Sequence, residues 1–354
     1  MKIFEMIAEM GHEQVVFCSD LSSGYRGIIV IHSTALGPSV GGTRFWNYSS
    51  EEEAIIDALR LARGMTYKNA VAGLPFGGGK SVILGDNKTT EREKIFRAHG
   101  RFIETLGGRY LAGEDVGTST TDIGYVSLET RHVGGLEGKS GDPSIMTAHG
   151  VFYAMRAAAH HRWGSDDLSG RIVAIQGCGH VGYNLAKELH TAGARLIVSD
   201  INAEQVTRAV TEFGAERVEP ESIYGVEADI FAPCALGGII NDETIPQFKI
   251  EIIAGAANNQ LLEERHGLLL EERSILYAPD YVANAGGVIN GVCIELLGWE
   301  AERTHEKVRR IHDTMLEVFE LARKTGGPTS EAAGRLAELR LKEGPEGKEQ
   351  KASL

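Results

Sequence analysis

Short apolar runs alternate with amphipathic segments along the N-terminal part of the chain, a pattern that predicts an α/β domain. Strands are expected over residues 14–20, 25–33, 81–84 and 109–112, with a Ser-Ser-Gly turn between the first two. Helices are expected over residues 51–63 and 90–106; the first has apolar residues at helical spacing behind a serine cap. Residues 36–44 are expected to form a loop, and residues 64–80 a glycine-rich segment before the next strand.

A glycine-rich, charged stretch over residues 134–144 is followed by a second alternating pattern, and we interpret this stretch as a hinge. In the second pattern strands are expected over residues 171–176, 195–199, 230–232, 250–254 and 275–278. Helices are expected over residues 147–161, 183–192, 288–297 and 300–324. The chain is therefore predicted to form two domains, 1–140 and 141–325, with a C-terminal helix and a charged, frayed tail in 326–354.

Length and charge narrow the classes of protein and partner. A chain of 354 residues suggests two domains of roughly 150 residues each. The net charge of −13 would repel a polyanion, so nucleic acid is not an expected partner. The N-terminus lacks the apolar core of a signal peptide, and no uncharged apolar run reaches the ~20 residues that span a bilayer. We therefore expect a cytoplasmic protein without a membrane partner.

The spacing of the cysteines also favours a cytoplasmic protein. Cys18, Cys178, Cys234 and Cys293 are far apart and form no C-x-x-C pair. This spacing argues against a zinc site and against a disulfide framework, and it fits a reducing cytosol. No metal site is expected.

The clearest local motif follows the expected strand 171–176. Gly177, Gly179 and Gly182 form G-x-G-x-x-G between a strand and a helix, and the next strand ends in Asp200. Such glycines permit a tight turn, close approach of a pyrophosphate and close helix packing. Asp200 stands at the distance typical of the acid that binds the ribose hydroxyls, and its charge would repel a 2′-phosphate. The motif predicts a Rossmann domain that binds NAD rather than NADP.

A second candidate site lies in residues 64–80, where Lys68 and Lys80 flank an apolar, glycine-rich segment. A lysine held in a dry pocket near another cation loses its proton more easily and suits the role of a base. The alternative is a surface loop with solvated lysines. A phosphate-binding P-loop is a further alternative, but its register requires glycine where the chain has Leu74.

Loops rich in small and amide residues follow the later strands, where a doubly wound sheet binds its ligands. Asn258 and Asn284 in these loops could bond the nicotinamide side of a dinucleotide, although each could equally be a turn or a cap. The expected cofactor-binding residues are Thr147, Gly177, Cys178, Gly179, His180, Val181, Gly182, Tyr183, Asp200, Cys234, Ala235, Ala256, Asn258 and Asn284.

Several short motifs occur in one order along nearly the whole chain. They are Gly41-Gly-Thr-Arg44, Lys68, Gly77-Gly-Gly-Lys80, Glu114-Asp-Val-Gly117, the fingerprint at 177–182, the segments 232–238 and 255–259, and Asn284-Ala-Gly-Gly287. In this order they resemble the Glu/Leu/Phe/Val amino-acid dehydrogenases, most closely the leucine dehydrogenase branch. The resemblance implies an N-terminal substrate domain, a Rossmann domain and a cleft between them that closes on the substrate.

The resemblance also implies the reaction: an L-amino acid, NAD and water give a 2-oxo acid, ammonium and NADH. By similarity, Lys68 binds the substrate carboxylate, Lys80 activates water, Asp115 carries protons to and from the nitrogen, and Thr147 supports the nicotinamide. The family's leucine enzymes are usually octamers, so a homo-oligomer, octamer or dimer, is expected.

Positions that match the family's side-chain pocket are small or apolar, namely Val40, Gly41, Met65, Gly113, Ile145 and Val288. None could pair with a carboxylate, which disfavours glutamate as substrate. Gly113 stands where leucine enzymes usually have alanine and phenylalanine enzymes often have glycine, and residues 74–76 also depart from the usual leucine pattern. Leucine, valine and phenylalanine therefore all stay open.

Two further alternatives belong to other classes of protein. Oxidation of a 2-hydroxy acid would normally use a histidine base and an arginine clamp, and no such pair stands out. An NAD-binding regulator without catalysis would not need Lys68, Lys80 and Asp115 together. The main expectation is an NAD-dependent dehydrogenase of branched-chain amino acids.

Overall fold

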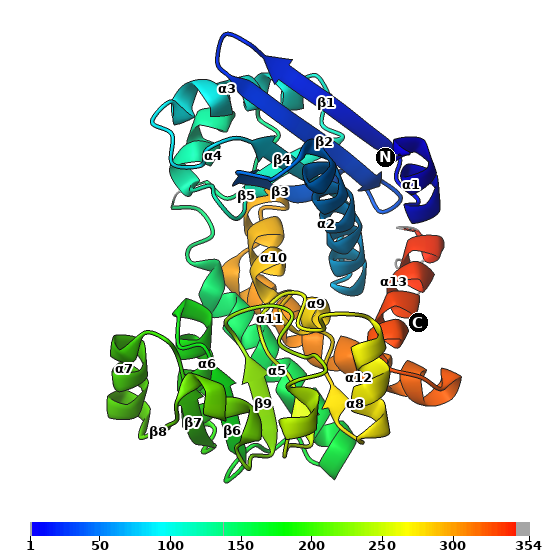
Figure 1. Cartoon of the computed structure of the whole chain (residues 1–354). Helices are drawn as coiled ribbons and strands as arrows, with labels where there is room; N and C mark the ends of the chain where they lie inside the picture. Colours follow the sequence, from blue (N-terminus) through cyan, green and yellow to red (C-terminus); the bar gives the residue numbers. More distant parts are fainter. Residues whose placement is uncertain (1, 137, 345–354) are drawn as a thin grey trace. The chain divides into compact units, whose positions relative to one another are not determined.

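A computed structural model describes residues 2–136 and 138–344 (Figure 1). The described residues form two compact units. The first contains residues 2–136 and 138–141, then Gly291–Trp299, and residues 337–344. The second contains Asp142–Asn290 and Glu300–Leu336.

A five-stranded sheet organises the first unit. Its strands are β1 (Gln14–Asp20), β2 (Tyr25–Ser33), β3 (Ser39–Trp46), β4 (Gly77–Leu84) and β5 (Tyr110–Glu114), in the order β1-β2-β4-β3-β5. The pairs β1–β2 and β2–β4 are antiparallel, whereas β3 runs parallel to both β4 and β5. The carboxyl ends of β3, β4 and β5 therefore lie at one edge of the sheet.

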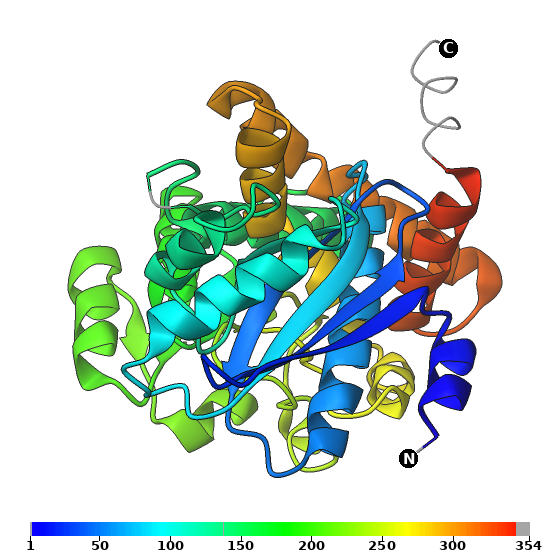
Figure 2. The ribbon, with the colours of Figure 1, turned by 90° about the horizontal axis from the view of Figure 1, so that it is seen from above.

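Helices cover both faces of this sheet (Figure 2). Helix α2 (Glu51–Val71) packs Ala58 and Leu59 against Val30 and Val82 on one face. Helices α3 (Arg92–Glu104) and α4 (Thr120–Ser127) cover the other face, where Ile29, Ile31 and Ile83 are buried. Alternate strand residues point to opposite faces, so each strand contributes to both layers of the core.

The second unit contains a six-stranded parallel sheet. Its strands are β6 (Ile172–Gln176), β7 (Arg195–Ser199), β8 (Glu216–Arg217), β9 (Ile230–Pro233), β10 (Ile252–Ile253) and β11 (Leu276–Tyr277), in the order β11-β10-β9-β6-β7-β8. The order reverses next to β6, and this is the strand order of a doubly wound dinucleotide-binding fold. The α/β class and the Rossmann fold predicted from the sequence are confirmed.

The remaining helices lie along the rest of the chain. They are α1 (Ile3–Met10), α5 (Pro143–Trp163), α6 (His180–Thr191), α7 (Ala203–Phe213), α8 (Arg265–Glu272), α9 (Asp280–Ala283), α10 (Gly286–Gly291), α11 (Ala301–Arg309), α12 (Ile311–Thr325) and α13 (Thr329–Glu343), with a π-helical turn at Val292–Leu296. The sequence pattern predicts none of α1, α4, α7 and α8. The single helix expected over 300–324 is wrong, because α11 and α12 are separate. Residues 345–354 of the tail expected to fray lie outside the described residues.

Two predictions near the lysines are wrong. Residues 39–46 form strand β3 rather than a loop, and α2 continues past Gly64 to Val71. Strand β4 begins at Gly77 because its glycines are in close contact with other segments: an added Cβ would lie 1.8 Å from Ser33 O at Gly77 and 2.0 Å from Thr66 N at Gly78. The glycines thus permit close backbone packing rather than a flexible loop.

Candidate active site

Lys80 lies in the middle of β4, opposite Val30 of β2. Its side chain is on the face that α2 covers and is only 5 % exposed. Helix α2 comes close at this point because Gly78, two residues earlier on the same face, has no side chain. The sequence therefore buries an amine in the interior of the unit.

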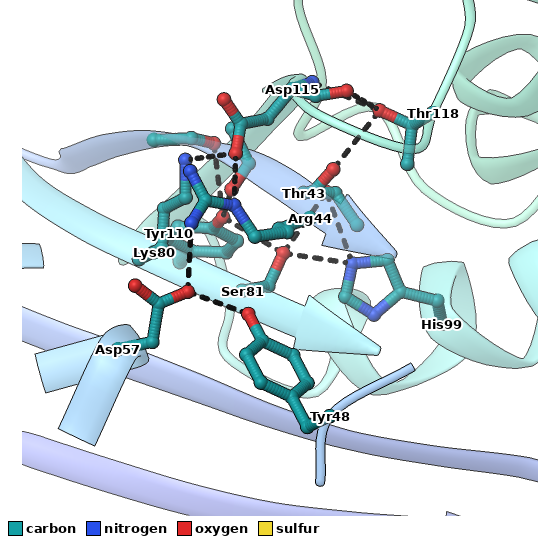
Figure 3. Close-up of polar contacts among 12 residues, drawn as sticks. Thr43, Arg44, Tyr48, Asp57, Lys80, Ser81, His99, Tyr110, Asp115 and Thr118 are labelled. Carbon is teal, nitrogen blue, oxygen red and sulfur yellow. Dashed lines mark hydrogen bonds and ion pairs between the residues drawn. The ribbon is translucent and has the colours of Figure 1, made fainter. Parts of the chain in front are cut away.

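A polar cluster surrounds this amine, and we call it the Lys80–Asp115 cluster: Arg44, Tyr48, Asp57, Lys80 and Asp115 (Figure 3). Lys80 Nζ lies 2.8 Å from Asp115 Oδ2, and Arg44 Nε donates to the same oxygen at 3.0 Å. Arg44 Nη1 donates to Asp57 Oδ2 at 2.8 Å, and the Tyr48 hydroxyl donates to that oxygen at 2.6 Å. One chain of contacts therefore joins α2, β3, β4 and the end of β5.

The cluster changes the protonation behaviour of its members. Burial lowers the pKa of Lys80 below its ordinary value, and the Asp115 carboxylate offsets only part of this effect. Burial alone would raise the pKa of Asp115, but the charges of Lys80 and Arg44 outweigh it and bring the pKa below its usual value. The site thus holds a carboxylate beside an amine that loses its proton more easily than a solvated lysine does.

Asp115 is held by its own loop as well as by the two cations. Its backbone N–H donates to Thr118 Oγ1 at 2.9 Å, and that hydroxyl donates to Thr43 O at 3.0 Å (Figure 3). Gly42 leaves room for this arrangement, since an added Cβ would lie 2.8 Å from Asp115 Cβ. The loop after β5 is therefore docked on β3, which positions the carboxylate.

A buried polar network lies on the other face of the same strands. His99 Nε2 is 3.1 Å from Ser81 Oγ, and Ser81 donates to Thr43 Oγ1 at 2.9 Å. The Tyr110 hydroxyl donates to Gly41 O at 2.9 Å. Burial lowers the pKa of His99 to about 3, so this imidazole is neutral at physiological pH. These bonds fix β3 and β4 relative to α3.

The other residues expected at the substrate are divided between the two units. Val40 and Gly41 are on β3, Met65 and Lys68 on α2, and Gly113 on β5, all in the first unit. Lys68 is half-buried. Ile145 on α5 and Val288 on α10 belong to the second unit.

In the second unit the fingerprint forms the expected turn between β6 and α6. Gly177 has φ +96°, and Gly182 lets the helix start approach, since an added Cβ would lie 1.9 Å from Gly177 O. The Cys178 N–H donates to Asp200 Oδ2 at 2.6 Å, which joins the turn to the end of β7. At Gly179 an added Cβ would meet no atom of the described residues within 4 Å. The open side of the turn fits the close approach of a pyrophosphate.

The loops after β9, β10 and β11 also fit a dinucleotide. Asn284 Nδ2 donates to Asn258 Oδ1 at 2.7 Å and to Ala256 O at 3.0 Å. Asn284 Oδ1 is buried and has no hydrogen-bond partner within the described ranges 2–136 and 138–344. Such an acceptor fits the amide of a nicotinamide ring. Thr147 Oγ1 donates to Pro143 O at 2.9 Å, and Gly287 lies against it.

The other expected cofactor residues surround the fingerprint turn. An added Cβ at Gly177 would lie 2.8 Å from Ala235 Cβ, so the loop after β9 is packed against the turn. The Tyr183 hydroxyl contacts Glu212 on α7 at 2.5 Å. Burial raises the pKa of the Cys178 and Cys234 thiols to about 12, so neither is a thiolate at neutral pH. His180 and Val181 begin α6.

Two of the residues in the Lys80–Asp115 cluster were not indicated by the sequence pattern. Asp57 is on the face of α2 toward the sheet, and Tyr48 lies between β3 and α2. Arg44 occurs in a recognised motif, but its two carboxylate partners are 13 and 71 residues away. Only sequence information that reports contacts between positions far apart in the chain could have identified these contacts.

In the described part of the chain, no three His, Cys, Asp or Glu residues are grouped so that they could hold a metal ion. Among the described helices, none is long and apolar enough to cross a membrane. The four cysteines are free thiols.

Comparison with known proteins places these sites in a family context. Residues 12–132 match the family described as "Glu/Leu/Phe/Val dehydrogenase, dimerisation domain", and residues 134–208 and 198–343 match "Glutamate/Leucine/Phenylalanine/Valine dehydrogenase". The chain is 58 % identical to leucine dehydrogenase of Thermoactinomyces intermedius and 56 % identical to that of Geobacillus stearothermophilus. Both alignments cover 96 % of this chain and 94 % of the relative.

A solved structure shows the same relationship. The L-tryptophan dehydrogenase of Nostoc punctiforme is 47 % identical, with a TM-score of 0.88 over 96 % of this chain and 98 % of that one. Glutamate dehydrogenase of Thermus thermophilus, at 22 % identity and a TM-score of 0.75, shares the fold.

Proposed function

This chain belongs to the Glu/Leu/Phe/Val dehydrogenase family of amino-acid dehydrogenases, and we propose that it oxidatively deaminates a branched-chain L-amino acid with NAD. The observation that carries the proposal is the buried Lys80 amine 2.8 Å from the Asp115 carboxylate. Deamination needs a base and a proton carrier in contact, because both water and the amino nitrogen exchange protons during the reaction. The relatives named leucine dehydrogenase support an aliphatic substrate.

The residues take the following roles. Lys68 binds the substrate carboxylate through a charge-assisted contact. A nicotinamide cofactor, when bound, would accept the hydride from the substrate carbon, which would convert the amine to an imine. Asp115 takes a proton from the substrate ammonium before hydride transfer and returns it to the departing nitrogen. Neutral Lys80 takes a proton from the water that attacks the imine carbon. The products are the 2-oxo acid, ammonium and NADH, and the reaction is reversible.

We assign NAD binding to the second unit, with the pyrophosphate at the fingerprint turn and the ribose at Asp200. A nicotinamide cofactor follows from family membership. The choice of NAD rests on Asp200, which directly follows β7 and whose carboxylate would repel the 2′-phosphate of NADP. Asn258 and Asn284 are assigned to the carboxamide side.

The pocket for the side chain is assigned to Val40, Gly41, Met65, Gly113 and Val288. Phenylalanine is a second candidate substrate, and one observation favours it. An added Cβ at Gly113 would meet only Gly134 O, at 3.7 Å, among the described residues, so this position leaves space. Relatives named L-tryptophan dehydrogenase and phenylalanine dehydrogenase are 48–49 % identical to this chain over 96 % of its length.

The organisation of the chain is part of the proposal. We assign substrate binding and oligomerisation to residues 1–140, NAD binding to 141–325, and a C-terminal helix and tail to 326–354. A homo-oligomer, octamer or dimer, is supported by the description of the N-terminal family model as a dimerisation domain. The four free thiols support a cytoplasmic location.

The test is NADH formation with each standard amino acid and several 2-hydroxy acids, in the wild type and in two variants. Lys80→Ala is expected to lower kcat about 100- to 10,000-fold, the usual contribution of a general base, while NADH binding stays intact. Lys68→Ala is expected to raise KM about 10- to 150-fold, because a charged hydrogen bond contributes roughly 1.5–3 kcal/mol. Fast oxidation of a 2-hydroxy acid, or a Lys80→Ala enzyme with most of its kcat, would overturn the assignment.

A further inference from the structure

Arg44 contacts both carboxylates of the Lys80–Asp115 cluster. Its Nε contacts Asp115 Oδ2 at 3.0 Å, and its Nη1 contacts Asp57 Oδ2 at 2.8 Å (Figure 3). Its side chain is only 22 % exposed, so these charges interact with little screening by water. Lys80 Nζ contacts the same oxygen of Asp115. Two cations therefore share one carboxylate oxygen.

We propose that Arg44 is a positioning residue for catalysis. It holds Asp115 between two cations, so that the carboxylate does not form an ion pair with Lys80 alone. This inference rests on the proposed deamination and adds a residue to its machinery. The roles given to Lys80 and Asp115 do not require a second cation, yet β3 supplies one in direct contact with the proton carrier.

Lys80 and Arg44 compete for the same oxygen of the Asp115 carboxylate. A lysine that is the only cation paired with a buried carboxylate forms a tight ion pair and keeps its proton. Arg44 weakens that pair in two ways, because it neutralises part of the Asp115 charge and because it repels a second positive charge nearby. Arg44 itself cannot lose its proton, so the proton that leaves the cluster comes from Lys80.

Arginine suits this task because its planar fork has donors in two directions. Asp57 on α2 accepts one of them, and the Tyr48 hydroxyl bonds to the same Asp57 oxygen at 2.6 Å. Asp57 therefore holds the guanidinium at a fixed place while the other donor reaches Asp115. A lysine at this position has a single ammonium group and could not bridge the two carboxylates in the same way.

The ionisable groups around Lys80, within the described part of the chain, come from several elements packed together. They include Asp115 after β5, Arg44 on β3, Asp57 on α2 and, through its bond to Asp57, Tyr48. Both carboxylates favour the protonated amine, and Arg44 opposes it. Tyr110 and the neutral His99 belong to the network on the opposite face of the sheet. Removal of Arg44 should therefore favour the protonated form of Lys80.

The experiment compares Arg44→Met, Arg44→Gln and Arg44→Lys with the wild type by two readouts. The first is the pH profile of kcat/KM for leucine with saturating NAD. The second, independent of activity, is the pH at which acetic anhydride acetylates Lys80, followed by peptide mass spectrometry. Arg26→Met is the matched control, since Arg26 is also a strand arginine facing an α2 carboxylate, Glu51, but at an exposed site 3.5 Å away.

Both neutral variants should move the acetylation midpoint and the acid limb of the profile upward by about one pH unit, the effect of removing a nearby charge. Their kcat at neutral pH should fall about tenfold, because less Lys80 is neutral. Arg44→Lys should keep the midpoint close to that of the wild type, because the charge stays. It should still lose kcat, because the bridge to Asp57 is lost. Arg26→Met should change nothing.

Two results would overturn the inference: an unchanged Lys80 midpoint in both neutral variants, or an equal shift in Arg44→Lys. If Arg44→Met does not fold, Arg44→Gln serves as the neutral variant in both readouts. Failure of the proposed function is a different outcome, namely a wild type that oxidises no amino acid. In that case the acetylation readout still decides whether Arg44 controls Lys80.

Discussion

Substitution of Gly113 by alanine separates substrate selectivity from folding. Gly113 pairs with Gly42 across β3 and β5. A Cβ added at Gly113 would have Gly134 O as its nearest neighbour among the described residues, at 3.7 Å, which is ordinary van der Waals contact. We therefore expect Gly113→Ala to fold normally, so that its effect reports on the pocket alone.

The expected effect depends on the size of the substrate. If Gly113 lines the pocket, the new methyl occupies space that a large aromatic ring needs. Extra bulk in a packed site costs about 1–3 kcal/mol, which corresponds to a loss of about 5- to 150-fold in kcat/KM for phenylalanine. Leucine and valine are smaller, and their kcat/KM should change less than about threefold.

The assay is kcat/KM for leucine, valine and phenylalanine in the wild type and in two variants, with thermal denaturation as a check on folding. Gly42→Ala is the contrast, since its Cβ would lie 2.6 Å from Glu114 O and 2.8 Å from Asp115 Cβ. That variant should displace the proton carrier and lower activity on all three substrates alike. An unchanged ratio of leucine to phenylalanine in Gly113→Ala would show that Gly113 does not line the pocket. A wild type that prefers phenylalanine tenfold would refute the branched-chain assignment.

Two further predictions concern the cofactor and the buried network. Asp200→Ala should raise KM for NAD about tenfold or more, because a charged hydrogen bond is lost, and should narrow the preference for NAD over NADP; equal kcat/KM for the two cofactors in the wild type would contradict this reasoning. His99 has a pKa of about 3 in the folded protein against 6.5 for an unperturbed histidine. The unfolded chain therefore binds the proton first as pH falls, and His99 should cost about 1.4 kcal/mol of unfolding free energy per pH unit between those two values. Urea unfolding at several pH values should show that the free energy of unfolding falls less steeply with decreasing pH in His99→Gln than in the wild type. Equal slopes in the two proteins would rule out the assigned burial effect.

Local patterns determined much of this fold. The β6–turn–α6 unit was predictable because its signals lie within one short segment: an apolar strand, three glycines at fixed spacing and an acid at the end of the next strand. The six-stranded sheet then follows the usual order of such folds. Boundaries were less predictable, since α2 continues through Gly64 and the long helix expected over 300–324 is divided at Arg310.

The conformation of the glycine-rich segments was decided by tertiary packing. Glycine in isolation favours turns, so β3 and the start of β4 could not be predicted as strands. In the folded unit, Gly77 and Gly78 are strand residues because neighbouring backbone atoms occupy the space where side chains would be. The gain from close packing and paired backbone groups outweighs the local preference.

The candidate site shows the same division. Lys80 and Asp115 are recognisable in the sequence because each belongs to a short motif of a known family. Their mutual distance, the burial of the amine and the presence of Arg44, Asp57 and Tyr48 beside them are properties of the folded unit. These five residues come from a helix, two strands and two loops that only the sheet order β4-β3-β5 brings together. A charge acquires its chemical behaviour from the groups that surround it in space, and tertiary structure alone determines which groups those are.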